Sequence, residues 1–455
     1  MQVIFERCAG LDVHKKTVVA CRVRATAAGQ AVREKRTFGT TTAELLQMLD
    51  WLVEWDCTHV AMESTGEFWK PVYNVLEGNL EVWLVNAQHA KAVPGRKTDV
   101  GDAEWLSDLM RHGLVRPSFI PPRPQRDLRD LTRTRCSLVR ERASVVNRVQ
   151  KVLEGANIKL SSVASDVLGL SGRAMLEALV AGQADPALLA NLARGKLRSK
   201  LPQLEQALVG RVREHHRFLL AHHLAHIDFL DEQIDSFSQE IHARLETALP
   251  PLPPADSPTP PTPPTTPSTD APDAPPSAAS SAPAPLPPLT WSQAVTLVDT
   301  SPGFDVRSAQ NILAEIGIDM KRFFDADHLA SWAGVAPGNN ESGGKHRSGR
   351  TPPGDRPVRR ILLQAAWTAA RTKGSYLSAL YHRLALRRGK KRAILAVAHS
   401  LIVSLYHMLT RQKPYRDLGA NYFDERKRES VTNNLVRRLE KLGYQVKLET
   451  KPSAT

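Results

Sequence analysis

The sequence predicts an α/β domain with a mixed sheet at the N-terminus, a helical coiled-coil arm after it, and a mainly α-helical domain at the C-terminus. Three observations lead to this fold class. Short apolar runs alternate with helical leucine spacing over residues 1–120, and an arginine-rich stretch with near-heptad apolar residues follows. Residues 250–288 hold more than half of the 32 prolines of the 455-residue chain and no Lys or Arg. Such a segment buries too little apolar surface to offset its ordering entropy, which predicts a disordered linker.

The N-terminal elements follow from the period of the apolar residues. Leucines three and four residues apart predict a helix over 42–55, with Thr41 or Thr42 as its cap. Compact or alternating apolar runs predict strands at residues 9–13, 17–23, 31–38, 58–62 and 81–85. Further helices are expected near 68–76 and over 100–112. Three strands followed by alternating helices and strands are typical of an α/β domain with a mixed sheet.

The arm is predicted from two helical stretches. In residues 124–154 apolar side chains recur near heptad spacing, with arginines between them, and residues 219–249 form a second helical stretch. Together they indicate an antiparallel helical arm or coiled coil that serves dimerisation. The arginines fit a solvated helix face and also a surface that follows a phosphate backbone, and these two interpretations are compatible.

The region after the linker is predicted to be mostly helical over 291–409, with a Gly-, Ser- and Arg-rich loop in its middle. A basic tail follows. We therefore expect five segments along the chain, with boundaries at residues 1–124, 125–249, 250–289, 290–412 and 413–455.

Composition limits the partners and the compartment. Lys and Arg total 61 against 47 Asp and Glu, a net charge of +14 that favours a polyanionic partner such as nucleic acid. The four cysteines contain no CxxC pair, which argues against a thiolate zinc site and suits a reducing compartment. No signal peptide and no run of 18 apolar residues is found, so we expect a cytoplasmic protein that does not enter a membrane.

Four acidic residues carry the first candidate chemistry. Asp12 lies inside an apolar strand, where a carboxylate is costly unless it is paired or bound to a cation, and Glu63 directly follows a strand. Asp99 and Asp102 are three residues apart at the expected start of a helix, which would put both on one face. Such oxygen donors suit Mg²⁺ or Mn²⁺, which can stabilise the attacking and leaving oxygens of a phosphodiester. Spacing alone equally allows Asp99 to be a helix cap and Glu63 a lone surface charge.

The loop ESGGKHRSGR, residues 341–350, carries the second candidate chemistry. Ser342 precedes two glycines that permit close approach of the backbone to a phosphate, while Lys345, Arg347 and Arg350 would offset charge on the phosphorus oxygens. The serine hydroxyl could attack a phosphodiester and form a phosphoserine link, with Ser348 as the competing nucleophile. Chemistry alone favours a simpler alternative, a flexible basic loop that only contacts DNA.

Two further features indicate nucleic-acid binding. Pro302 and Gly303 lead into a helix in the manner of a helix-hairpin-helix, whose amides can hold a DNA phosphate. The basic tract 356–371, which includes Arg359 and Arg360, suits phosphate binding and equally a solvated helix face.

These motifs resemble those of one family. The stretches GLDVHKKT, AMESTGEFWKPVYNVL and KTDVGDAEWLSDLMRHGLV are similar to the N-terminal domain of the insertion-sequence 110 family transposases. The stretches PGFDVRSAQNILAEIG, LASWAGVAPGNNESGGKHRSG and RRILLQAAWTAAR resemble the C-terminal transposase domain of the same family. The resemblance covers about residues 1–150 and 295–410.

The resemblance implies a fold and a mechanism. It implies a RuvC-like N-terminal domain of the ribonuclease H fold, whose DEDD set corresponds to Asp12, Glu63, Asp99 and Asp102, and a catalytic serine that corresponds best to Ser342. It also implies that the two sites combine between protomers, in dimers that assemble into tetramers. A structured non-coding RNA would guide the enzyme to donor and target DNA. The long proline-rich segment departs from the family pattern, although a flexible tether would suit assembly between protomers.

Two other functions fit parts of the sequence. A RuvC-like structure-specific nuclease would use the acidic residues for hydrolysis, with a C-terminal part that only binds DNA. A non-enzymatic nucleic-acid-binding protein, such as a decayed transposase, would need neither site. Acidic residues at all four corresponding positions favour the active enzyme.

Overall fold

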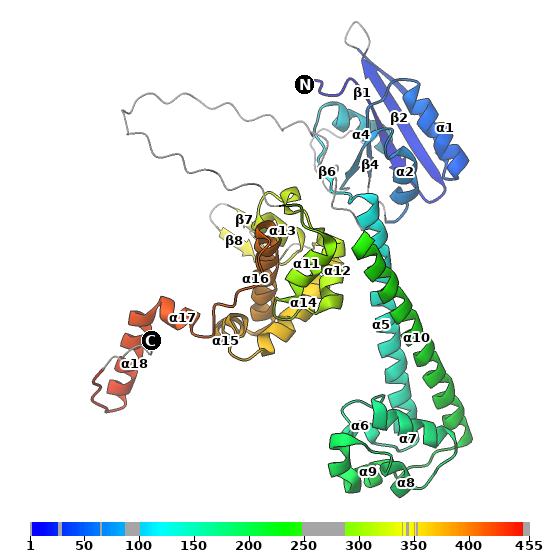
Figure 1. Cartoon of the computed structure of the whole chain (residues 1–455). Helices are drawn as coiled ribbons and strands as arrows, with labels where there is room; N and C mark the ends of the chain where they lie inside the picture. Colours follow the sequence, from blue (N-terminus) through cyan, green and yellow to red (C-terminus); the bar gives the residue numbers. More distant parts are fainter. Residues whose placement is uncertain are drawn as a thin grey trace. The chain divides into compact units, whose positions relative to one another are not determined.

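The computed structural model describes residues 2–25, 30–63, 66–86, 101–247, 287–338, 340–342, 345–349, 351 and 354–448. The chain forms two compact units, Met1–Pro122 and Arg123–Thr455, which are described separately (Figure 1). The proline-rich segment, expected as the linker, lies almost entirely outside the described residues.

The first unit is built on a six-stranded mixed sheet in the order β3-β2-β1-β4-β5-β6. The first three strands pair antiparallel, β1 pairs with β4 and β4 with β5 in parallel, and β6 pairs antiparallel with β5. The strands are β1 (Arg7–Val13), β2 (Thr17–Ala25), β3 (Ala31–Gly39), β4 (His59–Glu63), β5 (Glu81–Val85) and β6 (Pro117–Ser118). The mixed α/β fold predicted from the sequence is confirmed.

Helices cover both faces of this sheet. Helices α1 (Thr42–Val53) and α2 (Trp69–Leu76) share one core with the strand residues Leu11 and Met62. Helix α4 (Asp102–Arg111) packs on the opposite face, where Leu106 and Leu109 join a second core. The buried side chains therefore alternate between the two faces along β1, as the period of a strand requires.

Local sequence explains most of these elements. Thr41 is the N-cap of α1 and its hydroxyl accepts a hydrogen bond from the amide of Glu44, as one of the two predicted caps would. Helix α4 begins at Asp102, two residues later than expected. Strand β6 was not predicted, because two residues give no detectable period and the strand forms only by pairing with β5.

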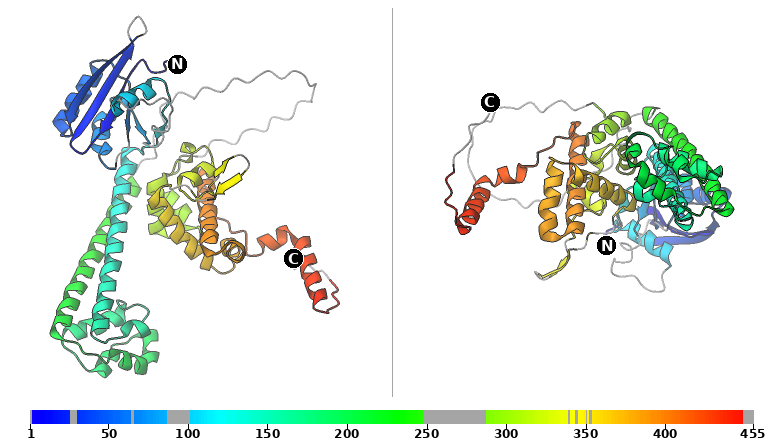
Figure 2. Two further views of the ribbon diagram at one scale, coloured as in Figure 1. Left: turned by 180° about the vertical axis from the view of Figure 1, so that it is seen from behind. Right: turned by 90° about the horizontal axis from the view of Figure 1, so that it is seen from below.

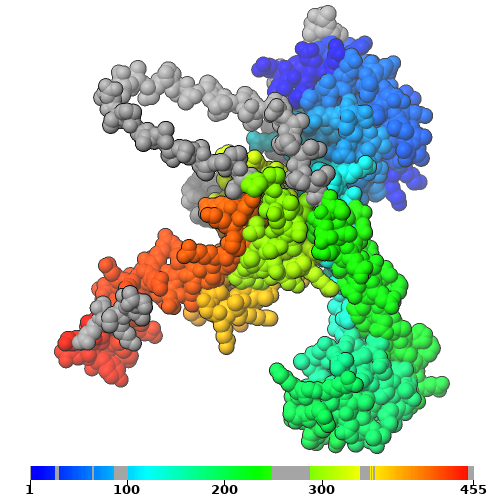
Figure 3. Space-filling model, viewed as in Figure 1, coloured from blue at the N-terminus to red at the C-terminus, as the bar shows by residue number. Residues whose placement is uncertain are grey.

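In the second unit, α5 (Arg123–Gly155) and α10 (Glu214–Thr247) run side by side (Figures 1 and 2). The pair is antiparallel, since Arg142 of α5 meets Asp231 of α10 at 2.9 Å, while Asp127 near the start of α5 meets Arg244 near the end of α10 at 3.6 Å. Short helices cap one end of the pair (Figure 3). They are α6 (Leu160–Val163), α7 (Leu170–Val180), α8 (Pro186–Ala190), the 3₁₀ helix η1 (Gly195–Lys200) and α9 (Leu201–Leu208).

The other end of the pair joins the C-terminal helices in a single core. Leu128 of α5 and Ile241 and Leu245 of α10 are buried in the same apolar cluster as the helices that follow residue 290. Those helices are α11 (Trp291–Asp299), α12 (Val306–Ile316), α13 (Ala326–Trp332), α14 (Arg356–Arg371), α15 (Tyr376–Arg388) and α16 (Lys390–Arg411), with the 3₁₀ helix η2 (Met320–Arg322) between α12 and α13. The mainly helical C-terminal region agrees with the prediction. The compact units divide after residue 122, because the arm and the C-terminal helices share this core.

The chain then continues into two further helices. They are α17 (Tyr422–Arg426) and α18 (Arg428–Lys441), and neither contributes a buried residue. Within the described part of the chain, α16 is the one helix long and apolar enough to cross a membrane. Half of its apolar stretch is buried inside the protein, and Val397, Leu401 and Leu405 belong to the C-terminal core. Helix α16 is therefore accounted for as a core helix.

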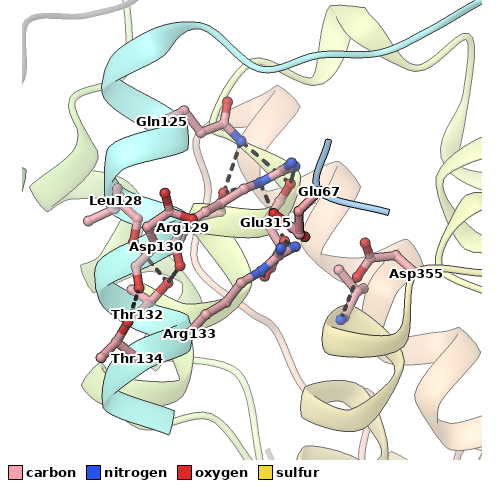
Figure 4. Close-up of polar contacts among 12 residues, drawn as sticks. Glu67, Gln125, Leu128, Arg129, Asp130, Thr132, Arg133, Thr134, Glu315 and Asp355 are labelled. Atoms are coloured by element: carbon pink, nitrogen blue, oxygen red, sulfur yellow. Dashed lines mark hydrogen bonds and ion pairs between the residues drawn. The ribbon is translucent and has the colours of Figure 1, made fainter. Parts of the chain in front are cut away.

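A buried ion-pair network fixes α5 to α12 (Figure 4). The Glu315 side chain is only 2% exposed, and Arg133 donates to its two oxygens at 2.7 and 2.8 Å. Gln125 and Arg129 each donate to the carbonyl oxygen of Ala314 at 3.0 Å, which satisfies a carbonyl that the end of α12 leaves without a helical partner. Arg129 also lies 3.3 Å from the Glu315 carboxylate. The arm and the C-terminal helices are therefore joined by charge as well as by apolar packing.

Adding a methyl group at Gly10 should lift α4 from the sheet. A Cβ there would lie 2.2 Å from the carbonyl oxygen of Ala103 and 2.4 Å from the amide nitrogen of Ser107, both backbone atoms. We expect Gly10→Ala to destabilise the first unit by about 3 kcal/mol, measured by urea denaturation. Gly39→Ala is the matched control, because its Cβ would meet only the mobile end of Glu44. Equal stability of the two variants would contradict the close packing of α4.

Removing the charge of Glu315 should loosen the join between α5 and α12. Glu315→Gln leaves Arg129 and Arg133 facing a neutral group inside a buried site, and we expect a loss of about 3 kcal/mol in the free energy of unfolding of the second unit. In the control, Glu240→Gln removes a half-exposed partner of Arg244 and should cost below about 1 kcal/mol. Thermal unfolding followed by calorimetry measures the stability of both variants. Comparable losses would show that the burial of Glu315 does not increase its contribution to stability.

Candidate active site

Strand pairing brings Asp12 and Glu63 together. The parallel register between β1 and β4 matches Leu11 with Met62, and both of these side chains lie in the core beneath α1. The next residues, Asp12 on β1 and Glu63 on β4, therefore face the opposite side of the sheet, which is the side that α4 covers. Neighbouring strands are about 4.8 Å apart, so the two carboxylates belong to one site. Both residues are partly exposed, with the Asp12 side chain at 23%.

Helix α4 carries Asp102 to the same edge of the sheet. The residues Asp102, Leu106 and Leu109 form one stripe of the helix, by their spacing of four and three. Leu106 and Leu109 pack against β1, β4 and β5 through Cys8, Ala61 and Val85. Ion pairs from α4 to β3 show that the helix runs antiparallel to β1, so Asp102, which heads the stripe, lies toward the carboxyl ends of β1 and β4.

The fourth acidic residue, Asp99, lies outside the described residues, so its predicted place on a helix face with Asp102 stays a prediction. No three His, Cys, Asp or Glu side chains of the described residues are arranged to hold a metal ion. The donor chemistry nevertheless fits a hard divalent cation, because two adjacent carboxylates repel each other unless a cation lies between them. Of the four predicted ligands, Asp12, Glu63 and Asp102 are among the described residues.

His14 is a neighbour that the sequence analysis missed. Its Nε2 lies 3.2 Å from Oδ2 of Asp12. Residues two apart on a strand face the same side, so the spacing within GLDVHKK was the available signal.

Two cysteines, Cys8 and Cys21, are buried beneath α4. Burial raises the pKa of the Cys8 thiol to about 12, and burial also raises the pKa of Cys21. Both thiols therefore stay neutral at physiological pH, which makes them poor nucleophiles and poor metal ligands. All four cysteines of the chain are free.

The predicted serine loop contains a β-hairpin. Strands β7 (Asn340–Ser342) and β8 (Lys345–Ser348) pair antiparallel, and the register matches Ser342 with Lys345. Ser348 is matched with Asn340, so the two candidate serines lie at opposite ends of the hairpin. The side chains of both strands, which include Arg347, and the whole of Arg350 lie outside the described residues.

The predicted phosphate-binding turn has a different explanation. Gly303 has a φ of +91°, and a Cβ there would lie 2.1 Å from the carbonyl oxygen of Ala365 in α14. Asp305 is the N-cap of α12 and accepts from the amide of Ser308 at 2.8 Å. Packing against α14 therefore accounts for the glycine, and an acidic side chain takes one of the amides expected to hold a phosphate.

Arg359 and Arg360 of α14 have different surroundings. Arg359 donates through Nη2 to the hydroxyl of Thr351 at 3.1 Å. Arg360 is exposed and borders a cavity formed with α5 and α12. Both residues were candidates for nucleic-acid binding in the sequence. Of the two, Arg360 lines this cavity and Arg359 does not.

Comparison with known families covers both halves of this arrangement. Residues 9–158 match a family model described as a transposase, the DEDD transposase of IS110. Residues 295–382 match the model described as the transposase IS116/IS110/IS902 family. Together the two ranges span more than half of the chain, in the order that the motifs predicted. A search of curated proteins returned no match.

A divalent cation should stabilise the first unit through Asp12. Saturating Mg²⁺ or Mn²⁺ at about a hundred times its dissociation constant should raise the unfolding free energy by about 2.7 kcal/mol, because it binds only the folded site. Asp12→Asn should abolish this gain, while without the metal its stability should differ from the parent by below about 1 kcal/mol, since both the repulsion from Glu63 and the contact with His14 are weakened at a partly exposed position. Asp50→Asn, an exposed change on α1, should keep the gain. Equal stabilisation of the parent and Asp12→Asn would exclude the site.

Proposed function

The chain belongs to the IS110 family of transposases, enzymes that cut and rejoin DNA, and on this premise we propose that Ser342 is its nucleophile and that Asp12, Glu63, Asp99 and Asp102 hold Mg²⁺ or Mn²⁺. The observation that carries the proposal is the meeting of Asp12 and Glu63 at adjacent ends of parallel strands, with Asp102 brought to the same edge by α4. The order of the sheet, antiparallel through β1 and parallel through β4 and β5, supports the RuvC-like ribonuclease H fold.

The serine chemistry is a transesterification. The Ser342 hydroxyl loses its proton and its Oγ attacks phosphorus, which forms a phosphoserine ester and releases a sugar hydroxyl of the cut strand. Attack by a sugar hydroxyl of a second strand re-forms a phosphodiester and frees the serine. The number of phosphate esters is unchanged at each step, so rejoining needs no external energy source.

Charged residues of the chain assist this exchange. Lys345 is matched with Ser342 in the hairpin, which supports a role for its ammonium group at the same phosphate, together with Arg347 and Arg350. A divalent ion on the acidic set would neutralise charge on phosphorus oxygens when bound. Arg359 and Arg360 would bind the flanking nucleic acid.

The proposed partners are donor and target DNA and a non-coding guide RNA, with homodimers that assemble into tetramers in the cytoplasm. The net charge of +14 supports nucleic-acid binding. The helical pair α5–α10 supports dimerisation through a coiled-coil arm, because large apolar side chains such as Phe218 and Phe229 are more than half exposed on α10. Assembly between protomers would then bring the serine of one chain to the acidic residues of another.

Replacing the nucleophile separates the proposal from its rivals. Ser342→Ala should abolish strand exchange and the protein–DNA adduct seen on denaturing gels, while DNA and RNA binding persist. Ser348→Ala is the matched control, because it changes the other end of the same hairpin and should keep both activities.

Three other outcomes would overturn the proposal. Loss of the adduct in Ser348→Ala alone would transfer the nucleophile to Ser348. Free DNA ends without any adduct in the parent protein would indicate a hydrolytic nuclease. An unchanged cleavage and integration assay in Asp12→Asn would indicate a protein that binds without catalysis.

A further inference from the structure

A cavity of about 490 Å³ lies within the second unit, between α5, the start of α12 and α14. Among the described residues that line it, none belongs to the acidic set or to the serine hairpin. Its volume is within the range of small-molecule sites and far larger than a single phosphate needs.

Five arginines line this cavity, namely Arg133, Arg135, Arg140, Arg307 and Arg360. Its two carboxylates are already engaged, since Glu315 binds Arg133 and Asp305 caps α12. Among the described residues, no carboxylate lies within ion-pair distance of Arg135, Arg140 or Arg360. The wall therefore carries an excess of positive charge that a bound anion would balance.

Arg135 is the most constrained of these cations. It is 2% exposed, and its hydrogen bonds go to neutral oxygens, those of Gln310 at 2.8 Å and Asn311 at 2.9 Å. Burial lowers the pKa of this guanidinium below its usual range. Buried charges are ordinarily paired, so a guanidinium held in a cavity wall by neutral groups would gain from a bound anion.

The cavity also has an apolar side. Val139, Pro357 and Ile361 line it, and the Val139 side chain is partly exposed. Apolar side chains beside guanidinium groups match a nucleotide, whose phosphate is anionic and whose base is flat and weakly polar. A base stacked inside a duplex cannot enter such a cavity, whereas a base in a single strand can.

We propose that this cavity binds one nucleotide of a single-stranded segment, with its phosphate on Arg135, Arg140 and Arg360 and its base against Val139 and Ile361. The inference rests on the proposed function only in taking nucleic acid as the partner. It assigns to the arm a binding role beside dimerisation.

Fluorescence anisotropy with the full chain and labelled oligouridylate, oligothymidylate or a short blunt DNA duplex tests the proposal. Arg140→Gln and Arg360→Gln should each weaken single-strand binding about tenfold, because each removes a charge-assisted contact. Each should also reduce the slope of log affinity against log salt by about 0.7. Comparison of oligouridylate with oligothymidylate shows whether RNA or DNA is preferred, and either preference supports the site.

Two further variants distinguish binding inside the cavity from binding to a basic surface. Val139→Trp keeps every charge but fills the space, and it should weaken single-strand binding by a similar factor while duplex binding stays unchanged. Arg198→Gln, an exposed charge on η1 far along the arm, removes the same charge outside the cavity and should bind like the parent.

Parent-like single-strand affinity in Arg140→Gln, Arg360→Gln and Val139→Trp would overturn the proposal. Equal weakening by Arg198→Gln would overturn it too, by showing that only net charge matters. The proposed chemistry is tested apart from this, because Ser342→Ala should retain full single-strand affinity while losing strand exchange. A failure of one proposal therefore leaves the other standing.

Discussion

The second unit depends on one buried carboxylate, Glu315. It lies at the end of α12 and binds two arginines of α5, so a charge that would be costly alone becomes the link between arm and C-terminal helices. Apolar packing of Leu128 and Ile241 alone would permit several relative positions of the helices. The paired hydrogen bonds from Arg133 to Glu315 permit only one of these positions. The same link forms part of the arginine-lined cavity, because Arg133 and Glu315 border it.

In the first unit, close backbone packing fixes the position of α4 on the sheet. Because Gly10 has no side chain, α4 can lie directly on β1, and this contact brings the start of the helix to the edge where β1 and β4 end. Carboxylates gathered there repel one another, and under the proposed function a bound cation would offset that repulsion. Stability and chemistry are thus coupled through a single helix.

The two units together suit an enzyme that exchanges DNA strands. The first unit brings carboxylates to one edge of its sheet, the hairpin pairs Ser342 with Lys345, and α10 presents exposed aromatic residues. Transesterification needs stable positions for the reacting groups more than it needs an external energy source.

The sequence by itself predicted the strands and helices that have a clear period, two candidate caps for α1 and the family, because each of these is written in local spacing or in residue identity. It could not show β6, which exists only by pairing, or the hairpin in a glycine-rich stretch that has little period of its own. The tertiary structure alone decided that the arm shares a core with the C-terminal helices and that arginines from α5, α12 and α14 surround one cavity. Those contacts join residues about 170 to 190 positions apart, and long-range packing of that kind leaves no periodic trace in the chain.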